Sequence, residues 1–427
     1  MKWRNQLLAL FCLVVFLGLG VLYFKNWVVQ KPFGIILFIG EGLDPARLAI
    51  TRIYAADAAT PLTLDTLSYT ALLKNYSTDS TTPDRAAAAT ALATGIKVKN
   101  GTVGLGAENK ALENLLQLAH RSGRMTGLVT DASLTNATAA AFYAHAKSAT
   151  DRQSLARKLA KQGGIDVILG GGSADFLPTT KAGERDDGAD LVQEMHTAGY
   201  DLVQTTDELE EVPRWRRAKL LGLFNSTDLA YADDDVARAT QPTLADMVRR
   251  SIELLQFNRG GYLLVVDAGL MRKAAEANDA DHALLETIEL DRAVAEALQY
   301  AGTKSLVIVC GDVSIGGMNL NGFAPREASG GIWWGATAAE GPSMTWATGP
   351  NGATPSETPM EAPPEPPGED ATDNPAPELL FEPAAIYAAR ARENAADVIA
   401  LGVGPGADAL HGLLESTSIF EIIHDNL

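Results

Sequence analysis

Four acidic residues stand at or just after apolar runs of this chain: Glu41, Asp131, Asp267 and Asp312. Such runs are typical of buried parallel strands, whose carboxyl ends share the edge of a sheet where α/β proteins place their chemistry. Acidic side chains gathered there therefore point to a functional site. The plainer alternative is that each acid starts a loop or caps a helix.

A second informative segment is PDRAAAATALATG at 83–95. Thr82 is the expected N-cap, Pro83 suits a first turn, the alanines favour a helix, and Gly95 is a natural stop. Arg85 would then lie at the amino end of the helix. That end attracts anions, so an arginine there requires a nearby acidic partner.

Short apolar, β-branched runs alternate with helical patterns along the chain. This alternation predicts an α/β fold, a doubly wound, mostly parallel sheet with helices on both faces. The expected strands are 34–40, 125–130, 165–169, 262–266 and 306–310, and the expected helices include 112–120, 152–161 and 280–300.

Composition excludes several classes of protein. The chain has 427 residues, 46% of them hydrophobic, which is enough for one large core or two modest domains. A formal net charge of -18 predicts that it binds neither nucleic acid nor anionic lipid through a basic face. Its two cysteines, Cys12 and Cys310, build neither a disulfide framework nor a thiolate metal site.

The amino-terminal segment 7–24 is an unbroken run of 18 apolar or glycine residues that follows a basic start. It predicts an uncleaved signal anchor in a membrane, with the main body outside the cytoplasm, in the periplasm if the cell is Gram-negative. A cleaved signal peptide and a buried core helix are the alternatives. We therefore expect an anchor and linker at 1–31 and one domain at 32–427, interrupted by a proline-rich acidic insertion at about 345–383.

Several sequence blocks resemble those of the alkaline phosphatase family. The family's nucleophile helix reads aspartate, serine, small residues and TALATGxKxxNG, and residues 84–101 match it except that Arg85 stands in the serine position. The other blocks, in the family's order, are TGLVT at 126–130, ATAAAFYAH at 137–145, DVILGGG at 166–172, AND at 277–279, DRAV at 291–294 and VGPGA at 403–407. The resemblance covers almost all of the chain after the anchor and implies an alkaline phosphatase-like fold.

The resemblance also implies a chemistry. In the family, two zinc ions flank a phosphate, a serine takes the phosphoryl group, and a zinc-bound hydroxide releases it, with a magnesium ion close by. Two metals about 4 Å apart stabilise both the attacking and the leaving oxygen. An arginine grips the phosphate with its planar fork.

The zinc positions implied by the resemblance do not hold zinc ligands. At the first zinc, an aspartate and two histidines are replaced by Arg272, Glu276 and Glu393. At the second, the positions hold Glu41, Asp312, Val313 in place of a histidine, and Arg85. A guanidinium keeps its proton and cannot ligate a cation. None of the six histidines falls in a ligand position, so no zinc is expected.

The magnesium positions, in contrast, hold oxygen donors: Glu41, Asn136, Thr138 and Asp267. With Asp312, they leave one Mg²⁺ or Ca²⁺ ion as the remaining candidate cofactor.

A competing hypothesis is that cationic side chains replace the metals. Arg85, Arg272 and Lys273 would then supply the positive charge that metal ions provide in the family. The acids that they would neutralise are Glu41, Asp84, Asp267 and Asp312. Arginines that point away from those acids would contradict this hypothesis.

The function expected from these replacements is that of a membrane-anchored, catalytically inactive family member that acts as a binding or structural subunit, with an unknown protein partner or as a homo-oligomer. One alternative is a phosphohydrolase of altered mechanism that uses one Mg²⁺-type ion and water, and a shifted nucleophile, Ser80 or Thr81, also leaves an enzyme open. Another is a module that binds phosphate or another anion without cleaving it, through Arg85 and Arg152 or Arg272. Arg152 is the nearest candidate for the phosphate-gripping arginine, whose own position holds Ala149.

Overall fold

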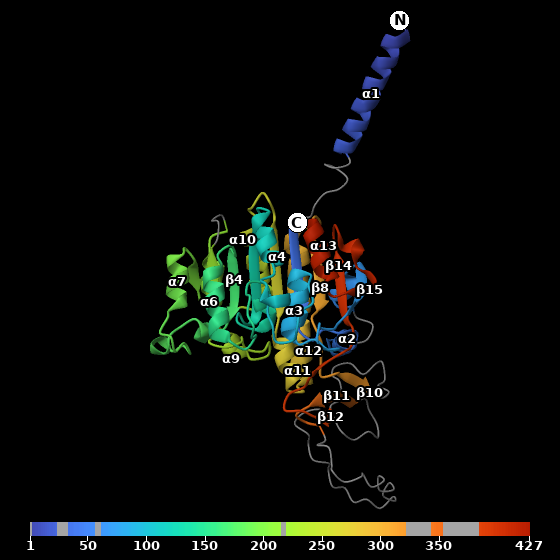
Figure 1. Cartoon of the computed structure of the whole chain (residues 1–427). Helices are drawn as coiled ribbons and strands as arrows, with labels where there is room; N and C mark the ends of the chain where they lie inside the picture. The colour runs from blue at the N-terminus through green and yellow to red at the C-terminus, as the bar shows by residue number, and fades with distance from the viewer. Residues whose placement is uncertain (1, 24–32, 56–60, 215–218, 322–342, 353–383) are drawn as a thin grey trace, which may run out of the picture.

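A computed structural model describes residues 2–23, 33–55, 61–214, 219–321, 343–352 and 384–427 (Figure 1). The strands of its large sheet are β1 (Gly34–Gly40), β2 (Tyr69–Lys74), β3 (Met125–Ser133), β4 (Val167–Gly171), β5 (Asp201–Val203), β6 (Leu220–Leu223), β7 (Tyr262–Ala268), β8 (Leu306–Gly311), β14 (Val398–Val403) and β15 (His411–Glu415). Their order is β15-β2-β14-β8-β1-β7-β3-β4-β6-β5. Only β14 runs antiparallel to its neighbours among these strands, so the predicted mostly parallel sheet is confirmed.

Helices cover both faces of this sheet, as predicted. One face carries α3 (Arg85–Thr94), α4 (Leu115–Arg121), α5 (Ala137–Ala141), α6 (Arg152–Gln162), α7 (Leu191–Thr197) and α13 (Ser418–Asn426). The other carries α2 (Pro45–Ala55), α8 (Thr206–Glu211), α10 (Leu244–Leu255), α11 (Leu270–Glu276) and α12 (Ala280–Ala301). The short α9 (Asp235–Arg238) buries no residue. Side chains of β1 alternate between the two cores, which makes β1 a central strand buried on both faces.

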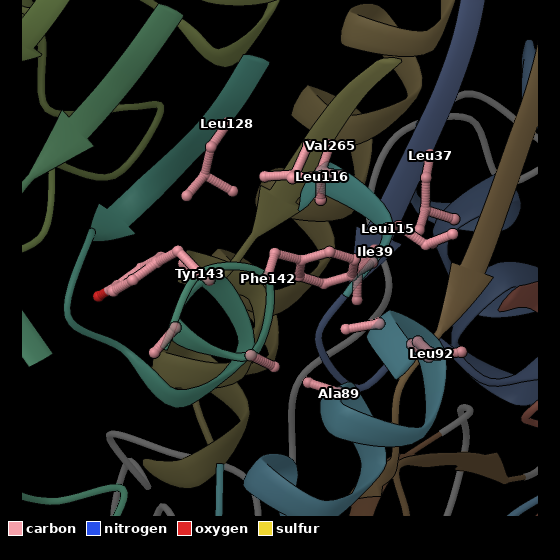
Figure 2. Close-up of a cluster of buried hydrophobic side chains, with 14 of the residues drawn as sticks. Leu37, Ile39, Ala89, Leu92, Leu115, Leu116, Leu128, Phe142, Tyr143 and Val265 are labelled. Atoms are coloured by element: carbon pink, nitrogen blue, oxygen red, sulfur yellow. The ribbon is translucent and has the colours of Figure 1, made fainter. Parts of the chain in front are cut away.

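The packing of α3 against the sheet fixes its first residue, Arg85, in space. Residues 86–94 are all buried, and Ala89 and Leu92 lie in the cluster that includes Ile39 of β1 and Phe142 (Figure 2). Alanine side chains allow the helix to approach its neighbours closely. Arg85 is therefore held at the carboxyl edge of the sheet, the end at which the parallel strands finish.

Some element boundaries differ from the sequence-based predictions. α4 begins at Leu115, three residues after 112, because Asn114 and Gln117 form a capping box. β3 continues to Ser133, so Asp131 lies within the strand and not after it.

The start of the proline-rich insertion was also predicted too early. Residues 343–349 form β11 (Ser343–Gly349), which pairs with β10 (Asn319–Asn321) and β12 (Ala384–Tyr387). Its Trp346 is buried in one cluster with Val313 and with Ile315 of β9 (Ser314–Ile315), a strand that pairs with β13 (Glu393–Asn394). The many prolines after residue 349 led to the prediction of an insertion that included part of this strand. Residues 353–383 of the predicted insertion lie outside the described residues.

The amino-terminal segment forms one helix, α1 (Lys2–Tyr23), long and apolar enough to cross a membrane. None of the window from Trp3 to Gly20 is buried against the described part of the chain, so the buried core helix is excluded as an explanation. A membrane anchor and a signal sequence both remain consistent with such a helix.

Candidate functional site

The carboxyl edge of the sheet brings three predicted acids together. Glu41 follows β1, which lies between β7 and β8 in the sheet. Asp267 lies in β7, and Asp312 comes directly after β8. In the register, Ile39 pairs with Asp267, and Gly40 pairs with Gly311. All three acids are buried, so their carboxylates require partners inside the protein.

Arg272 of α11 supplies the closest positive charge. Its Nε lies 2.5 Å from Oε2 of Glu41, and its Nη1 lies 3.1 Å from Oε2 of Glu276, one turn along the same helix. Burial lowers the pKa of Arg272, but the carboxylates of Glu41 and Glu276 outweigh burial and raise it above its ordinary value. Arg272 thus remains charged and forms a buried ion pair at the position that the resemblance assigns to the first zinc site.

Arg85, at the amino end of α3, lies near Glu41 and Glu276 as well. Its Nη1 is 4.0 Å from Oε2 of Glu41, its Nη2 is 3.6 Å from Oε1 of Glu276, and its Nε is 3.8 Å from Oε1 of Glu393. These distances are ion pairs rather than hydrogen bonds. The acidic partners that an arginine at a helix amino end requires are therefore present.

Two details of the metal-replacement hypothesis are wrong. The carboxylate of Asp84 does not pair with an arginine; it accepts hydrogen bonds from the backbone N–H groups of Ala87, at 2.8 Å, and Gly101, at 2.6 Å. Asp84 is thus the N-cap of α3, the role predicted for Thr82. Lys273 turns away from the site, where its Nζ lies 3.8 Å from Oδ2 of Asp228.

Two buried carboxylate oxygens at the site have no partner among the described residues. Oε1 of Glu41 accepts no hydrogen bond, and neither does Oδ1 of Asp267, whose Oδ2 accepts one from Thr130 at 2.9 Å. Burial and the charge of Glu41 raise the pKa of Asp267. A proton on Asp267 or a bound cation would satisfy these oxygens.

The third acid, Asp312, is held by the backbone. Its Oδ1 accepts hydrogen bonds from the N–H groups of Gly42, at 3.1 Å, and Val313, at 2.6 Å, and its Oδ2 accepts one from Thr138 at 3.4 Å. Burial and Glu41 still raise its pKa. Both Asp267 and Asp312 therefore hold protons more readily than ordinary aspartates do.

The zinc positions do not fit zinc. The side chain at the histidine position, Val313, is buried in an apolar cluster with Ile315 and Trp346, and Arg272 fills the place of a carboxylate. No group of three or more histidine, cysteine, aspartate or glutamate side chains in the described ranges is arranged to hold a metal. A valine and a guanidinium supply no zinc ligand, and the lack of zinc in this chain stays a prediction.

The magnesium positions fit their ion only in part. Thr138 is buried and donates to Asp312, and Asn136 caps α5 without a capping hydrogen bond and leaves its Nδ2 unpartnered. The second oxygen of Glu41 is already bound by Arg272. The oxygens of Glu41, Asp267 and Thr138 could contribute to a Mg²⁺ site, but the guanidinium beside them opposes a dication.

A cavity of about 430 Å³ opens beside α3. Its walls include the basic side chains of Arg85, Lys147 and Arg152 and the acidic side chains of Asp84 and Glu393. Arg152, however, is already engaged, because its Nη2 lies 3.0 Å from Oδ2 of the buried Asp175 and 2.9 Å from Oγ of Ser133. The two candidate anion-binding arginines thus meet at one cavity, each with an acidic partner.

Sequence reasoning missed two buried groups near the site. Arg47 of α2 is buried, and its Nη1 donates to the carbonyl oxygens of Glu41 and Met271 at 3.4 Å each. Glu286 of α12 is buried too, and burial together with the charge of Asp131 raises its pKa to about 8. Both lie on ordinary amphipathic helices, so no local pattern distinguishes them.

Comparison with known proteins agrees with this geometry. The family model for alkaline phosphatase matches residues 34–427. The chain belongs to the alkaline phosphatase family. Among its relatives, alkaline phosphatase H of Pseudomonas aeruginosa is 33% identical over 332 residues, a match that covers 66% of this chain and 69% of the relative.

Solved structures of the family share the fold. The alkaline phosphatase of Thermus thermophilus superposes with a TM-score of 0.72 at 21% identity, covering 93% of this chain and 92% of that one. A His 135 Glu mutant of the TAB5 alkaline phosphatase, with Mg bound in its M3 site, has a TM-score of 0.69 at 20% identity and covers 93% of this chain and 98% of its own. A related structure thus holds a metal. That observation belongs to the related protein and does not show which metal this chain binds.

Proposed function

We propose that this protein is a membrane-anchored member of the alkaline phosphatase family that does not hydrolyse phosphate esters and serves as a binding or structural subunit. α1 would hold it in the membrane, with the body outside the cytoplasm. Its partner would be another protein or a second copy of the chain.

The observation that carries this proposal is the pair of arginines among the acids of the site. Arg272 and Arg85 both approach Oε2 of Glu41, at 2.5 and 4.0 Å, where the family's zinc ions and serine would stand. Two guanidinium groups place positive charge beside the carboxyl groups of Glu41 and Glu276 without a metal. An arginine that always keeps its proton cannot act as a nucleophile toward phosphorus.

A second candidate function is a phosphohydrolase that uses one Mg²⁺-type ion. The unpartnered oxygens of Glu41 and Asp267 favour it, because a buried carboxylate oxygen without a partner is unusual. Against it stand the raised pKa of Asp267, which favours a proton, and the nearby cation of Arg272.

A third candidate, the anion-binding module, draws on the cavity lined by Arg85, Lys147 and Arg152. In that case inorganic phosphate should raise the melting temperature without any turnover, by the linkage between binding and stability.

Hydrolysis of p-nitrophenyl phosphate tests the proposed loss of catalysis. The full chain should turn over at least about 10⁴-fold more slowly than alkaline phosphatase H of Pseudomonas aeruginosa, with Mg²⁺ and Zn²⁺ both supplied. Arg85→Ser alone should not restore turnover, because Arg272 still fills the first zinc position. Turnover by the wild-type chain that requires Mg²⁺ would contradict the proposal and support the second candidate.

A further inference from the structure

The two ends of the sheet differ in their charged side chains, because the acids of the carboxyl edge are buried, with Glu41 paired to Arg85 and Arg272, whereas exposed basic residues gather at the amino edge. At the carboxyl edge lie the buried acids Glu41, Asp267 and Asp312. At the amino edge, where the parallel strands begin, basic residues precede one strand after another. They are Lys304 before β8, Arg259 before β7, Arg121 and Arg124 before β3, Lys161 before β4 and Lys219 before β6.

The loops of this amino edge are contiguous, because hydrogen bonds join them. The N–H of Phe33 donates to the carbonyl of Lys304 at 3.0 Å, and the N–H of Tyr262 donates to the carbonyl of Phe33 at 3.1 Å. Asn258 of the next loop donates to the carbonyl of Gly123 at 2.8 Å. The segments 302–305, 257–261 and 121–124, which flank the start of β1, therefore form one surface.

This surface is basic and carries no acid in those three segments. Lys161, Arg259 and Lys304 are exposed, and none of them has an ion-pair partner among the residues that the structure describes. Acids do accompany part of this end: Glu113 pairs with Arg121 at 2.5 Å, and Asp425 of α13 lies 3.6 Å from His424. Composition alone predicted no basic face, because the net charge of -18 averages over both ends of the molecule.

An exposed aromatic side chain accompanies the charges. Phe257, in the loop before β7, exposes 61% of its surface, and Phe33, immediately before β1, exposes 37%. Aromatic side chains beside lysine and arginine are typical of surfaces that meet lipid headgroups.

The position of α1 in the chain directs this surface toward a membrane. Only residues 24 to 33 separate α1 from β1, and ten residues span at most about 35 Å. β1 begins at the amino edge, near α13 and the carboxyl terminus, whereas α11 and the sheet of β10 to β12 lie at the opposite end (Figure 1). An anchored α1 would therefore hold the amino edge nearest to the bilayer and turn the candidate site away from it.

We infer, on the basis of the membrane anchor proposed above, that the amino edge binds the anionic phospholipid surface in which α1 is embedded. Lysines and arginines attract anionic headgroups within about 10 Å at physiological salt, and each contact adds to the hold of the anchor. The anchor supplies the high local concentration, and the basic surface fixes the orientation of the body.

A cysteine-labelling experiment on the full chain tests this inference. Cys310 is buried, and an embedded α1 would place Cys12 inside the bilayer, so Thr303→Cys adds the one thiol open to the reagent, on the amino edge. The matched control, Ser148→Cys, places an exposed thiol beside the candidate site. Each variant is reconstituted in vesicles of phosphatidylcholine alone or with a third of phosphatidylglycerol, and its rate of reaction with a maleimide-polyethylene glycol is measured.

The inference predicts that phosphatidylglycerol slows labelling of Thr303→Cys roughly tenfold and leaves Ser148→Cys unchanged. Adding Lys161→Glu and Arg259→Glu should abolish the slowing, whereas Lys99→Glu and Lys110→Glu, with the same change in net charge, should preserve it. A chain that resists carbonate extraction but labels equally in both vesicles would overturn the inference and leave the anchor intact. A chain that carbonate releases would overturn the anchor as well, and slowing that survives the charge reversal would exclude recognition of anionic lipid.

Discussion

Replacing Arg272 with methionine is expected to destabilise the protein by about 3–5 kcal/mol, one of the two largest effects that we predict. The substitution leaves Glu41 buried without the guanidinium that lies 2.5 Å from it. Arg85, at 4.0 Å, is too distant to replace it fully. Urea unfolding of the full chain in detergent at pH 7 measures the loss.

Two companion variants make this result specific. Arg272→Met combined with Glu41→Gln should recover most of the lost stability, because the unpaired charge is removed together with its partner. Arg121→Met breaks an exposed ion pair with Glu113 and should cost no more than about 1 kcal/mol. If Arg272→Met were as mild as Arg121→Met, Arg272 would not be the cation that holds the site.

The second large effect is a loss of stability as the pH rises. Burial raises the pKa of Asp131 to about 7 and that of Glu286 to about 8, while both titrate near 4 in the unfolded chain. The folded protein thus holds protons that the unfolded chain releases. The contribution is complete below about pH 4 and is lost as the pH rises to about 8, by up to about 1.4 kcal/mol per pH unit for each group.

Glu286→Gln separates this effect from general alkaline denaturation. Removing one titrating group should flatten the decline in unfolding free energy between about pH 5 and pH 8. Glu194→Gln, which changes an exposed acid on α7, should leave the slope as it is in the wild type. A stability that stays level or rises over this range would show that these carboxyl groups are ionised in the folded protein.

Much of the fold followed from the sequence because its strands are short apolar runs with little ambiguity. Residues 34–40 form β1 as predicted, and the family blocks fixed the order of the elements. β11 was missed because the prolines that follow it dominate the composition of its region, while its buried apolar side chains, Met344 and Trp346, give only one alternation.

The site was predictable where a residue's chemistry demands a partner. An arginine at the amino end of α3 required acids, and the structure places Glu41, Glu276 and Glu393 around it. Sequence could not assign Asp84 to the N-cap, because Thr82 and Asp84 are both good capping residues and tertiary packing selects between them.

The basic surface at the amino edge could not be predicted from the sequence, for a different reason. Lys304, Arg259 and Lys161 are scattered over more than a hundred residues, and only the strand order brings their loops to one end of the sheet. A net charge has no direction, so it could not reveal that exposed basic residues gather at one end of the sheet.

Metal content is the measurement that tests the central claim most directly. The full chain, purified without chelators and dialysed against buffer that contains Zn²⁺ and Mg²⁺, is analysed by mass spectrometry, with alkaline phosphatase H of Pseudomonas aeruginosa treated identically. Arginines in place of metals predict well under one zinc per chain and no gain in melting temperature from either ion. One or more zinc ions per chain, with p-nitrophenyl phosphate turnover, would contradict the replacement of metals by Arg85 and Arg272.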